Sequence, residues 1–360
     1  MDYSKEMKPE IQEKMKKNLV YVGIFAVVMF FAGLTSAYYV NMGGAFWLKY
    51  PMPSGFYMST LAILLSSLCF ILALKSIKQG KTKGLKTYML ATLLFGLLFV
   101  FFQFTSYRQL INRGIYNPSM YWTYPEILVN DGRYGDTIMA TVNGKPILVD
   151  GNAFSIANKP MSPKEFRDFQ AYMKHYAVPE QVIFKKQSTP LKGFASNKYK
   201  IYLNNEPLLI KEGHFYYNDT TMMVHTDEIR LCKVAMNVTL GRGHFMIKGE
   251  YGKDFNVFFK GKPLTYKQGA FWVDGRILNE SAQLKARETA DNASAFLYVI
   301  TFAHLLHVLG ALLYLIIMVK NSLTNVYTQE KHLSLKLGAL FWHFLGILWL
   351  YLFLFLNFIH

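Results

Sequence analysis

Three histidines lie within the two long apolar stretches at the C-terminal end of the sequence. His304 and His307 belong to the stretch 292–319, and His343 belongs to the stretch 337–359. Residues three positions apart lie on one face of a helix, so His304 and His307 are expected to point in similar directions. Imidazole binds haem iron and other metals, transfers protons near neutral pH and forms neutral hydrogen bonds. These residues therefore decide which class of chemistry the chain can perform.

Three interpretations of the histidines are open from the residues alone. At about 1.5 Å per residue, His307 and His343 can reach similar depths on two neighbouring helices, where they could hold a haem or a metal. They could instead relay protons, or bond as neutral imidazoles across a helix interface or to backbone carbonyls. A catalytic haem–copper centre would need more histidines than these. Cys69 and Cys232 form no CxxC pattern, so neither a thiolate metal site nor a covalently attached haem is expected.

Five uncharged apolar runs are each long enough to cross a membrane. A helix needs about 20 apolar residues to span about 30 Å of hydrocarbon. None of the runs contains Asp, Glu, Lys or Arg, which pumps and carriers normally place inside the membrane. We therefore expect a multi-span membrane protein without a complete ion pathway of its own. The runs are 18–48, 51–74, 87–107, 292–319 and 337–359.

The net charge of +16 is concentrated in alternate loops. Lysines precede the first run, fill the connection between the second and third runs, and recur between the fourth and fifth. The loop between the first and second runs holds only Lys49. This alternation predicts an N-terminus inside the cell, with the segment 111–290 and the C-terminal His360 outside. It indicates retention near anionic headgroups and argues against nucleic-acid binding. The first run is too long for a cleavable signal peptide.

The segment 111–290 has the composition of strands and turns. Gly, Pro, Asn and Asp recur at short intervals between alternating aromatic and β-branched residues. A degenerate repeat of turn, proline, alternating stretch, glycine and phenylalanine predicts hairpins at 142–154, 203–215 and 259–271. Proline can begin a strand there without losing a ladder hydrogen bond. We expect one small antiparallel β-domain built on this unit.

One helix is predicted inside this segment, over 162–178. Ser162 suits the N-cap position, and Glu165 completes a capping box. Catalytic patterns are poor in the segment, because its histidines are scattered without metal-ligand spacing or a nearby carboxylate pattern. A docking surface for a partner is the favoured interpretation. These histidines are His175, His214, His225 and His244.

The predicted fold is therefore an all-α transmembrane bundle of five helices with an inserted β-rich domain outside the cytoplasm. The expected division is a cytoplasmic lead at 1–17, the first three transmembrane helices at 18–110, the insertion at 111–290, and the last two transmembrane helices at 291–360.

The apolar runs carry motifs that match a known family. In the fourth run the matching residues are Thr301, His304, His307, Val308 and Gly310, and in the fifth they are Trp342, His343, Phe344 and Trp349. Ser66 and Ser67 match in the second run, as do Gly96 and Gln103 in the third, and the first run is similar in character. The five runs resemble, in order, subunit III of the haem-copper oxidases. The insertion lies outside the resemblance.

The sequence departs from the family pattern where relatives carry acidic residues inside the membrane. Val27, Ser106 and Gly346 stand at those positions, and Phe302 replaces a glycine. These departures put in doubt any role in proton delivery that the family would imply.

The resemblance implies a non-catalytic subunit III of a respiratory terminal oxidase, with cytochrome c oxidase preferred over quinol oxidase. Haem and copper are then expected in partner subunits I and II, and this chain is expected to hold no cofactor, metal or catalytic residue. It would stabilise the catalytic subunit and retain phospholipid in a cleft during oxygen reduction and proton pumping. The candidate lipid-binding or helix-packing residues are His304, His307, Trp342, His343 and Trp349.

The resemblance further implies a bacterial cytoplasmic membrane with the insertion on the periplasmic side. There, residues 111–290 would dock another respiratory complex or a cytochrome c domain. Two hypotheses from other classes stand beside this one. The first is an independent membrane receptor or sensor whose outer β-domain binds a ligand. The second is a b-type cytochrome that uses His307 and His343.

Overall fold

The computed structural model of the chain describes most of its residues. These are 9–115, 138–150, 153–177, 191–203, 205–241, 251–267, 270–286 and 292–359. The chain divides into two compact units. We call them the helical unit (Met1–Asn41, Pro51–Leu110 and Phe296–His360) and the β-rich unit (Met42–Tyr50 and Ile111–Ala295).

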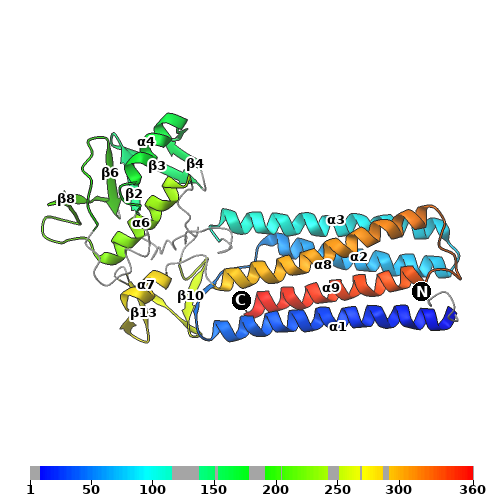
Figure 1. The fold of residues 1–360 in the computed structure, drawn as a ribbon. Helices are drawn as coiled ribbons and strands as arrows, with labels where there is room; N and C mark the ends of the chain where they lie inside the picture. Colours follow the sequence, from blue (N-terminus) through cyan, green and yellow to red (C-terminus); the bar gives the residue numbers. More distant parts are fainter. Residues whose placement is uncertain are drawn as a thin grey trace, which may run out of the picture. The chain divides into compact units, whose positions relative to one another are not determined.

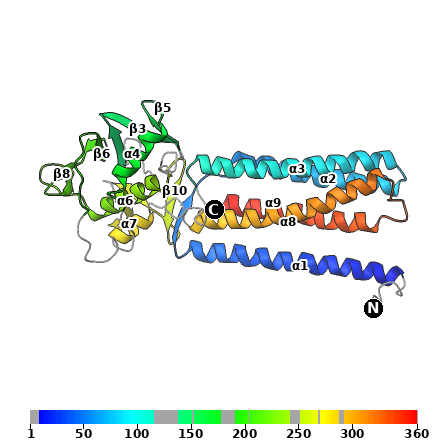
Figure 2. The same ribbon diagram turned by 45° about the horizontal axis from the view of Figure 1, so that its top comes forward.

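The helical unit contains five helices that are long and apolar enough to cross a membrane. They run side by side in Figure 1, and Figures 1 and 2 place α1 and α3 at opposite sides of the bundle. The prediction of five apolar spans is confirmed. The helices are α1 (Pro9–Met42), α2 (Ser54–Lys78), α3 (Thr82–Asn112), α8 (Asn292–Leu323) and α9 (Leu333–Ile359).

The first helix ends earlier than its apolar run. Helix α1 stops at Met42, and strand β1 (Phe46–Lys49) occupies the end of the run 18–48. The sequence Gly43–Gly44 separates the two, and glycine is a poor helix former that lets the chain change direction. The apolar run 18–48 therefore contains most of a long helix and most of a short strand.

Close packing in the bundle depends on small residues at the helix contacts. A Cβ atom on Gly96 of α3 would come within 3.0 Å of the side chains of Leu312 and Trp342. One on Gly55 of α2 would meet the backbone carbonyl of Phe102 at 3.0 Å. Membrane helices lack a hydrophobic force between them and rely on such close approach for van der Waals contact. At these two contacts, glycine on one helix lets a neighbouring helix approach closely.

In its described residues, the β-rich unit contains three copies of one supersecondary unit, which consists of antiparallel strands followed by a helix. Repeat 1 comprises β2 (Ile138–Val142), β3 (Lys145–Asp150), β4 (Ala153–Ile156), β5 (Lys159–Pro160) and α4 (Pro163–Met173). Repeat 2 comprises β6 (Tyr199–Leu203), β7 (Glu206–Pro207), β8 (Leu209–Lys211), β9 (His214–Tyr216) and α6 (His225–Thr239). Repeat 3 comprises β10 (Asn256–Phe259), β11 (Lys262–Pro263), β12 (Thr265–Lys267), β13 (Ala270–Val273), β14 (Arg276–Ile277) and α7 (Glu280–Ala286).

The repeats share one strand register. The prolines of the three hairpins pair in the same way, as Thr141 with Pro146, Tyr202 with Pro207, and Phe258 with Pro263. In repeats 1 and 3 the turn between these strands holds two residues at positive φ, of which the second is glycine (Gly144, Gly261). Such turns match the twist of a two-residue hairpin. The phenylalanine that ends each repeat motif is buried in all three, at Phe154, Phe215 and Phe271.

Four sheets result from this arrangement. Repeats 1 and 2 join in a six-stranded sheet of order β5-β4-β3-β2-β6-β7, while β8 and β9 pair separately. Strand β1 belongs to the three-stranded sheet β1-β10-β11, and β12-β13-β14 form the last sheet. Helices α4 and α6 cover the core of the first two repeats, where Phe169, Tyr172 and Leu231 are buried with Phe215.

The predicted capping box at the start of α4 is confirmed. The Ser162 hydroxyl accepts a hydrogen bond from the Glu165 backbone N–H, and the Ser162 backbone N–H donates to the Glu165 carboxylate at 2.8 Å. The helix itself ends at Met173, before the end of the predicted range 162–178. The hydrogen bonds from Ser162 lower the pKa of the Glu165 carboxyl from its ordinary value of 4.5.

Replacing the cap should destabilise the β-rich unit. We expect Ser162→Ala to lower its free energy of unfolding by about 1 kcal/mol, as for other lost N-caps. Because the folded pKa of Glu165 is depressed, the contribution of the box is present above pH 4.5 and is lost as pH falls through the lowered pKa. Urea unfolding at neutral and acidic pH measures both effects. A penalty for Ser162→Ala that stays the same at acidic pH would contradict this account.

Candidate functional site: the histidine and tryptophan contacts of the bundle

His304 is buried at the centre of an aromatic cluster. Its side chain is inaccessible to solvent and lies against Phe31, Phe99 and Trp349, with ring centroids 5.2 Å apart for His304 and Trp349. Its Nε2 lies 3.0 Å from the backbone carbonyl oxygen of Leu345. A carbonyl can only accept, so Nε2 carries the proton and donates. His304 thereby links α8 to α9 as a hydrogen-bonding group.

His307 shares a neighbour with His304 but bonds within its own helix. Both rings pack against Phe31 of α1, in accordance with their spacing of three residues. The Nδ1 atom of His307 donates to the Ala303 carbonyl oxygen at 2.8 Å, so Nδ1 is a protonated nitrogen of the ring. The ring is half-buried and also contacts Phe30.

His343 makes its contacts with a different helix. Its Nδ1 lies 2.5 Å from the Ser67 hydroxyl of α2, and its ring packs against Phe70 of the same helix. The ring of His307 packs against α1, whereas the ring of His343 packs against α2. This difference does not favour a haem held between the two residues. Within the described ranges, no group of three or more His, Cys, Asp or Glu residues is placed to hold a metal.

Two buried tryptophans of α9 connect this helix to α2 through serine and threonine hydroxyls. The Trp342 indole N–H donates to Ser66 Oγ at 3.1 Å, and that hydroxyl donates to the Thr92 carbonyl of α3 at 2.9 Å. The Trp349 indole N–H donates to Thr60 Oγ1 at 2.9 Å, and Thr60 donates in turn to the Phe56 carbonyl at 2.7 Å. Each hydroxyl accepts from one helix and donates to a backbone carbonyl, so both its polar functions are used.

The same two-step arrangement recurs elsewhere in the bundle. The Gln103 amide of α3 donates to Ser59 Oγ at 3.1 Å, and Ser59 donates to the Phe56 carbonyl. The Tyr107 hydroxyl donates to Thr301 Oγ1 at 3.1 Å, and Thr301 donates to Leu297. A third pair joins Tyr351 of α9 to Thr35 of α1. We call this arrangement, in which an aromatic or amide donor meets a hydroxyl that donates to a carbonyl, the hydroxyl relay.

Sequence reasoning missed several relay residues. Thr60, Ser59, Tyr107 and Thr35 were not predicted as site residues, although Ser66, Gln103 and Thr301 were matched to family motifs. The sequence feature that could indicate such a pair is a serine or threonine in one apolar run and a Trp, Tyr or Gln in another. Pairing them requires the helix arrangement, which the sequence does not state.

The other motif positions lie at helix contacts or at the bundle surface. Val308 is buried, Phe344 is half-buried, and Gly310 is exposed. Gly346, where relatives carry an acid, faces α2, because a Cβ there would lie 3.6 Å from Ile63 and 3.8 Å from Ser67.

The remaining altered positions likewise lie in apolar surroundings. Ser106 is buried and donates to the Phe102 carbonyl of its own helix at 2.8 Å. Val27 is half-buried, and Phe302 is exposed.

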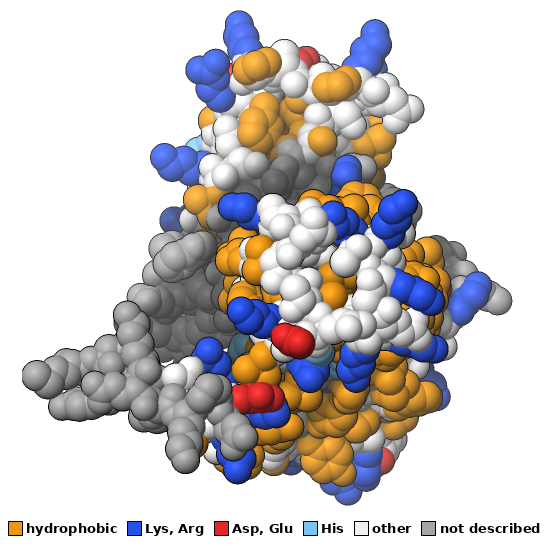
Figure 3. All heavy atoms as spheres, turned by 90° about the vertical axis from the view of Figure 1, so that its right-hand side faces the viewer, with side chains coloured by type: hydrophobic (Ala, Val, Ile, Leu, Met, Phe, Trp, Pro, Cys, Tyr) orange, Lys and Arg blue, Asp and Glu red, His pale blue; other side chains and the backbone are white. Residues whose placement is uncertain are grey.

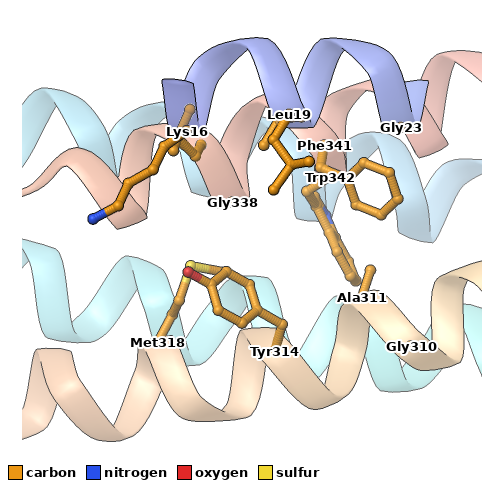
Figure 4. Close-up of a pocket in the computed structure, with 12 residues that line it drawn as sticks. Lys16, Leu19, Gly23, Gly310, Ala311, Tyr314, Met318, Gly338, Phe341 and Trp342 are labelled. Atoms are coloured by element: carbon orange, nitrogen blue, oxygen red, sulfur yellow. The ribbon is translucent and has the colours of Figure 1, made fainter. Parts of the chain in front are cut away.

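A cavity of about 470 Å³ opens between α1, α8 and α9. Its walls are almost entirely apolar, and Lys16 is the charged residue among them. Figure 4 shows Lys16 extending away from Phe341 and Trp342, so the charge and the aromatic rings lie toward different ends of the cavity. The lining residues are Lys16, Leu19, Val20, Gly23, Gly310, Ala311, Tyr314, Met318, Leu337, Gly338, Phe341 and Trp342.

The last two helices of the bundle match a known protein family. The family model for cytochrome c oxidase subunit III matches residues 283–359. The match covers α8 and α9 and includes His304, His307, His343 and both relay tryptophans, but not the three preceding spans or most of the β-rich unit. No curated protein matches the chain.

Enlarging the close contact at Gly96 should destabilise the bundle. We expect Gly96→Ala to lower the free energy of unfolding by about 1–3 kcal/mol, because the new methyl group overlaps Trp342 and Leu312. The matched control is Gly33→Ala on α1, where a Cβ meets nothing within 4 Å. Thermal unfolding of the purified chain in detergent measures both variants. Equal effects of the two substitutions would contradict the proposed packing.

Proposed function

Residues 283–359 carry a cytochrome c oxidase subunit III domain, and from this premise we propose that the chain is a non-catalytic subunit III of a haem-copper terminal oxidase in a bacterial cytoplasmic membrane. The observation that supports the proposal is the match of α8 and α9 to the family model, and all three histidines of this helix pair form hydrogen bonds. Haem and copper belong to partner subunits I and II. The role of this chain is to stabilise the catalytic subunit during oxygen reduction and proton pumping.

The polar interior of the bundle supports a structural role. Inside a membrane an unsatisfied polar group costs several kcal/mol, so buried serine, threonine and tryptophan must be paired. The hydroxyl relay pairs them between helices without introducing charge. Since no Asp, Glu, Lys or Arg lies within the apolar runs, proton movement is assigned to another subunit.

The cavity beside α1 supports retention of phospholipid. Its apolar walls suit an acyl chain, and Lys16 suits the phosphate of a headgroup. The lipid-binding or helix-packing role inferred from the resemblance is proposed for His304, His307, Trp342, His343 and Trp349, which pack between the helices of the bundle. Trp342 also lines the cavity directly.

The distribution of lysines supports the proposed orientation. Figure 3 shows Lys and Arg side chains gathered over the face that carries the α2–α3 and α8–α9 connections. The α2–α3 connection and its flanking turns contain five lysines without an acidic residue, whereas the α1–α2 connection contains Lys49. We assign the lysine-rich side to the cytoplasm and the β-rich unit to the periplasm. There the unit would dock another respiratory complex or a cytochrome c domain.

Purification in mild detergent tests the main proposal. We expect the tagged chain to co-purify with a haem-copper subunit I, identified by mass spectrometry, and the isolated chain to show no Soret band. A stable solitary protein that binds a ligand through its β-rich unit would support a receptor instead. A Soret band that disappears in His307→Ala and His343→Ala would support a b-type cytochrome.

Deleting the insertion tests the docking role separately. We expect removal of residues 115–288 to leave subunit I bound, because α8 and α9 remain, while steady-state oxidation of the electron donor slows or a co-purifying complex is lost. The full-length chain is the control. Unchanged partners and unchanged donor kinetics would refute the docking role and leave the subunit III assignment in place.

A further inference from the structure

Each repeat of the β-rich unit begins with a strand that has two edges. One edge pairs with the repeat's own proline strand, in the same register in all three repeats. The residue opposite the proline is Thr141 in repeat 1, Tyr202 in repeat 2 and Phe258 in repeat 3. These residues define equivalent positions, so the partners of the second edge can be compared directly.

Repeats 1 and 2 use the second edge to bind each other. Strands β2 and β6 pair antiparallel with Ala140 opposite Ile201 at the centre. Both residues stand one position before the residue that faces the proline, so the pairing is symmetric. Thr141 accordingly faces Lys200, and Met139 faces Tyr202. The first-strand edge of this repeat is therefore a self-recognition surface.

Repeat 3 has its second edge filled by the loop between α1 and α2. Strand β1 pairs antiparallel with β10, and Leu48 lies opposite Val257. Val257 is the equivalent of Ala140 and Ile201. Leu48 thus takes the central position that the first strand of another repeat would take. Trp47 faces Phe258, as Met139 faces Tyr202 in the first pair.

Both central residues of β1 are fully buried, since Trp47 and Leu48 are each 0% exposed. In repeat 2 the equivalent of Leu48, Ile201, is also buried, whereas Lys200, the equivalent of Trp47, is exposed. Burial therefore agrees at the central position, and the strand pairing itself sets the register. At the end of the strand, Phe46 stacks on Phe259 with centroids 4.4 Å apart.

We propose that β1 is a built-in docking strand, which replaces the first strand of a further repeat and closes the edge of repeat 3. The surface that it fills accepts an antiparallel strand with apolar residues at alternate positions, the general form of recognition by strand addition. Without β1, the backbone groups of β10 would form an open edge able to pair with other chains.

The docking strand lies between two of the long apolar helices in the sequence. Strand β1 starts at Phe46, shortly after α1 ends at Met42, and it ends at Lys49, shortly before α2 begins at Ser54. The insertion itself follows α3 and precedes α8. The β-rich unit is therefore assembled from two separate parts of the chain, 42–50 and 111–295, whatever partner the insertion has.

A strand graft tests the proposal in the full-length chain. The variant Phe46→Tyr, Leu48→Ile, Lys49→Tyr gives β1 the residues of β6 at the positions of Tyr199, Ile201 and Tyr202 and keeps the buried Trp47. Hydrogen exchange followed by mass spectrometry should find 256–259 as protected in this graft as in the native chain. Leu48→Asp should speed exchange there by about tenfold or more, while 138–142 and 199–203 stay protected.

The reciprocal control opens the other joint. Ile201→Asp should speed exchange at 138–142 and spare 256–259. A graft that exchanges as fast as Leu48→Asp would overturn the equivalence of β1 with a repeat strand. Protection of 256–259 that survives Leu48→Asp would overturn the docking itself.

A cross-link keeps the test independent of how well these variants fold. In a background with Cys69→Ser and Cys232→Ser, the pair Lys49→Cys and Asn256→Cys lies directly across the two strands. We expect rapid disulfide formation between these two positions. The offset pair Lys49→Cys and Phe258→Cys should form it far more slowly. Equal rates for both pairs would refute the register and with it the proposal.

Discussion

Hydrogen bonds between buried side chains of different helices organise the helical unit. Hydrocarbon offers no hydrogen bonds, so a hydroxyl or indole N–H inside the bundle must bond to protein. In the hydroxyl relay, each hydroxyl forms two hydrogen bonds, one as an acceptor and one as a donor. Ser66 accepts from Trp342 and donates to Thr92, and Thr60 accepts from Trp349 and donates to Phe56. These bonds connect α9 to α2 and α3 in a defined register.

The histidines of α8 also form hydrogen bonds. His304 donates to a backbone carbonyl of α9, and His307 donates to a carbonyl of its own helix. Both rings pack against Phe31. Each imidazole thereby adds a hydrogen bond and an aromatic contact to the packing of α8.

In the β-rich unit, the edge strand of the last repeat is paired with a strand from outside the repeats. Repeats 1 and 2 close each other's first-strand edge, so an odd third repeat is left with an open one. The loop between α1 and α2 provides β1 for that edge, with Leu48 in the place of Ile201. The β-rich unit consequently includes the loop between α1 and α2 as well as the insertion.

The sequence by itself determined the local elements. Uncharged runs of sufficient length specified the five spans, Ser162 and Glu165 specified the start of α4, and the proline–glycine repeat marked the hairpins. These features depend on neighbouring residues and on the surrounding solvent, so they are readable from the chain. Only the tertiary structure decided which distant residues meet. Ser67 meets His343, Trp349 meets Thr60, and the end of the first apolar run leaves the helix to pair with β10. Those contacts depend on how each helix is rotated and on which strands pair. Strands β1 and β10, for example, are separated by more than two hundred residues in the sequence. The periodicity of a single segment does not specify such pairings.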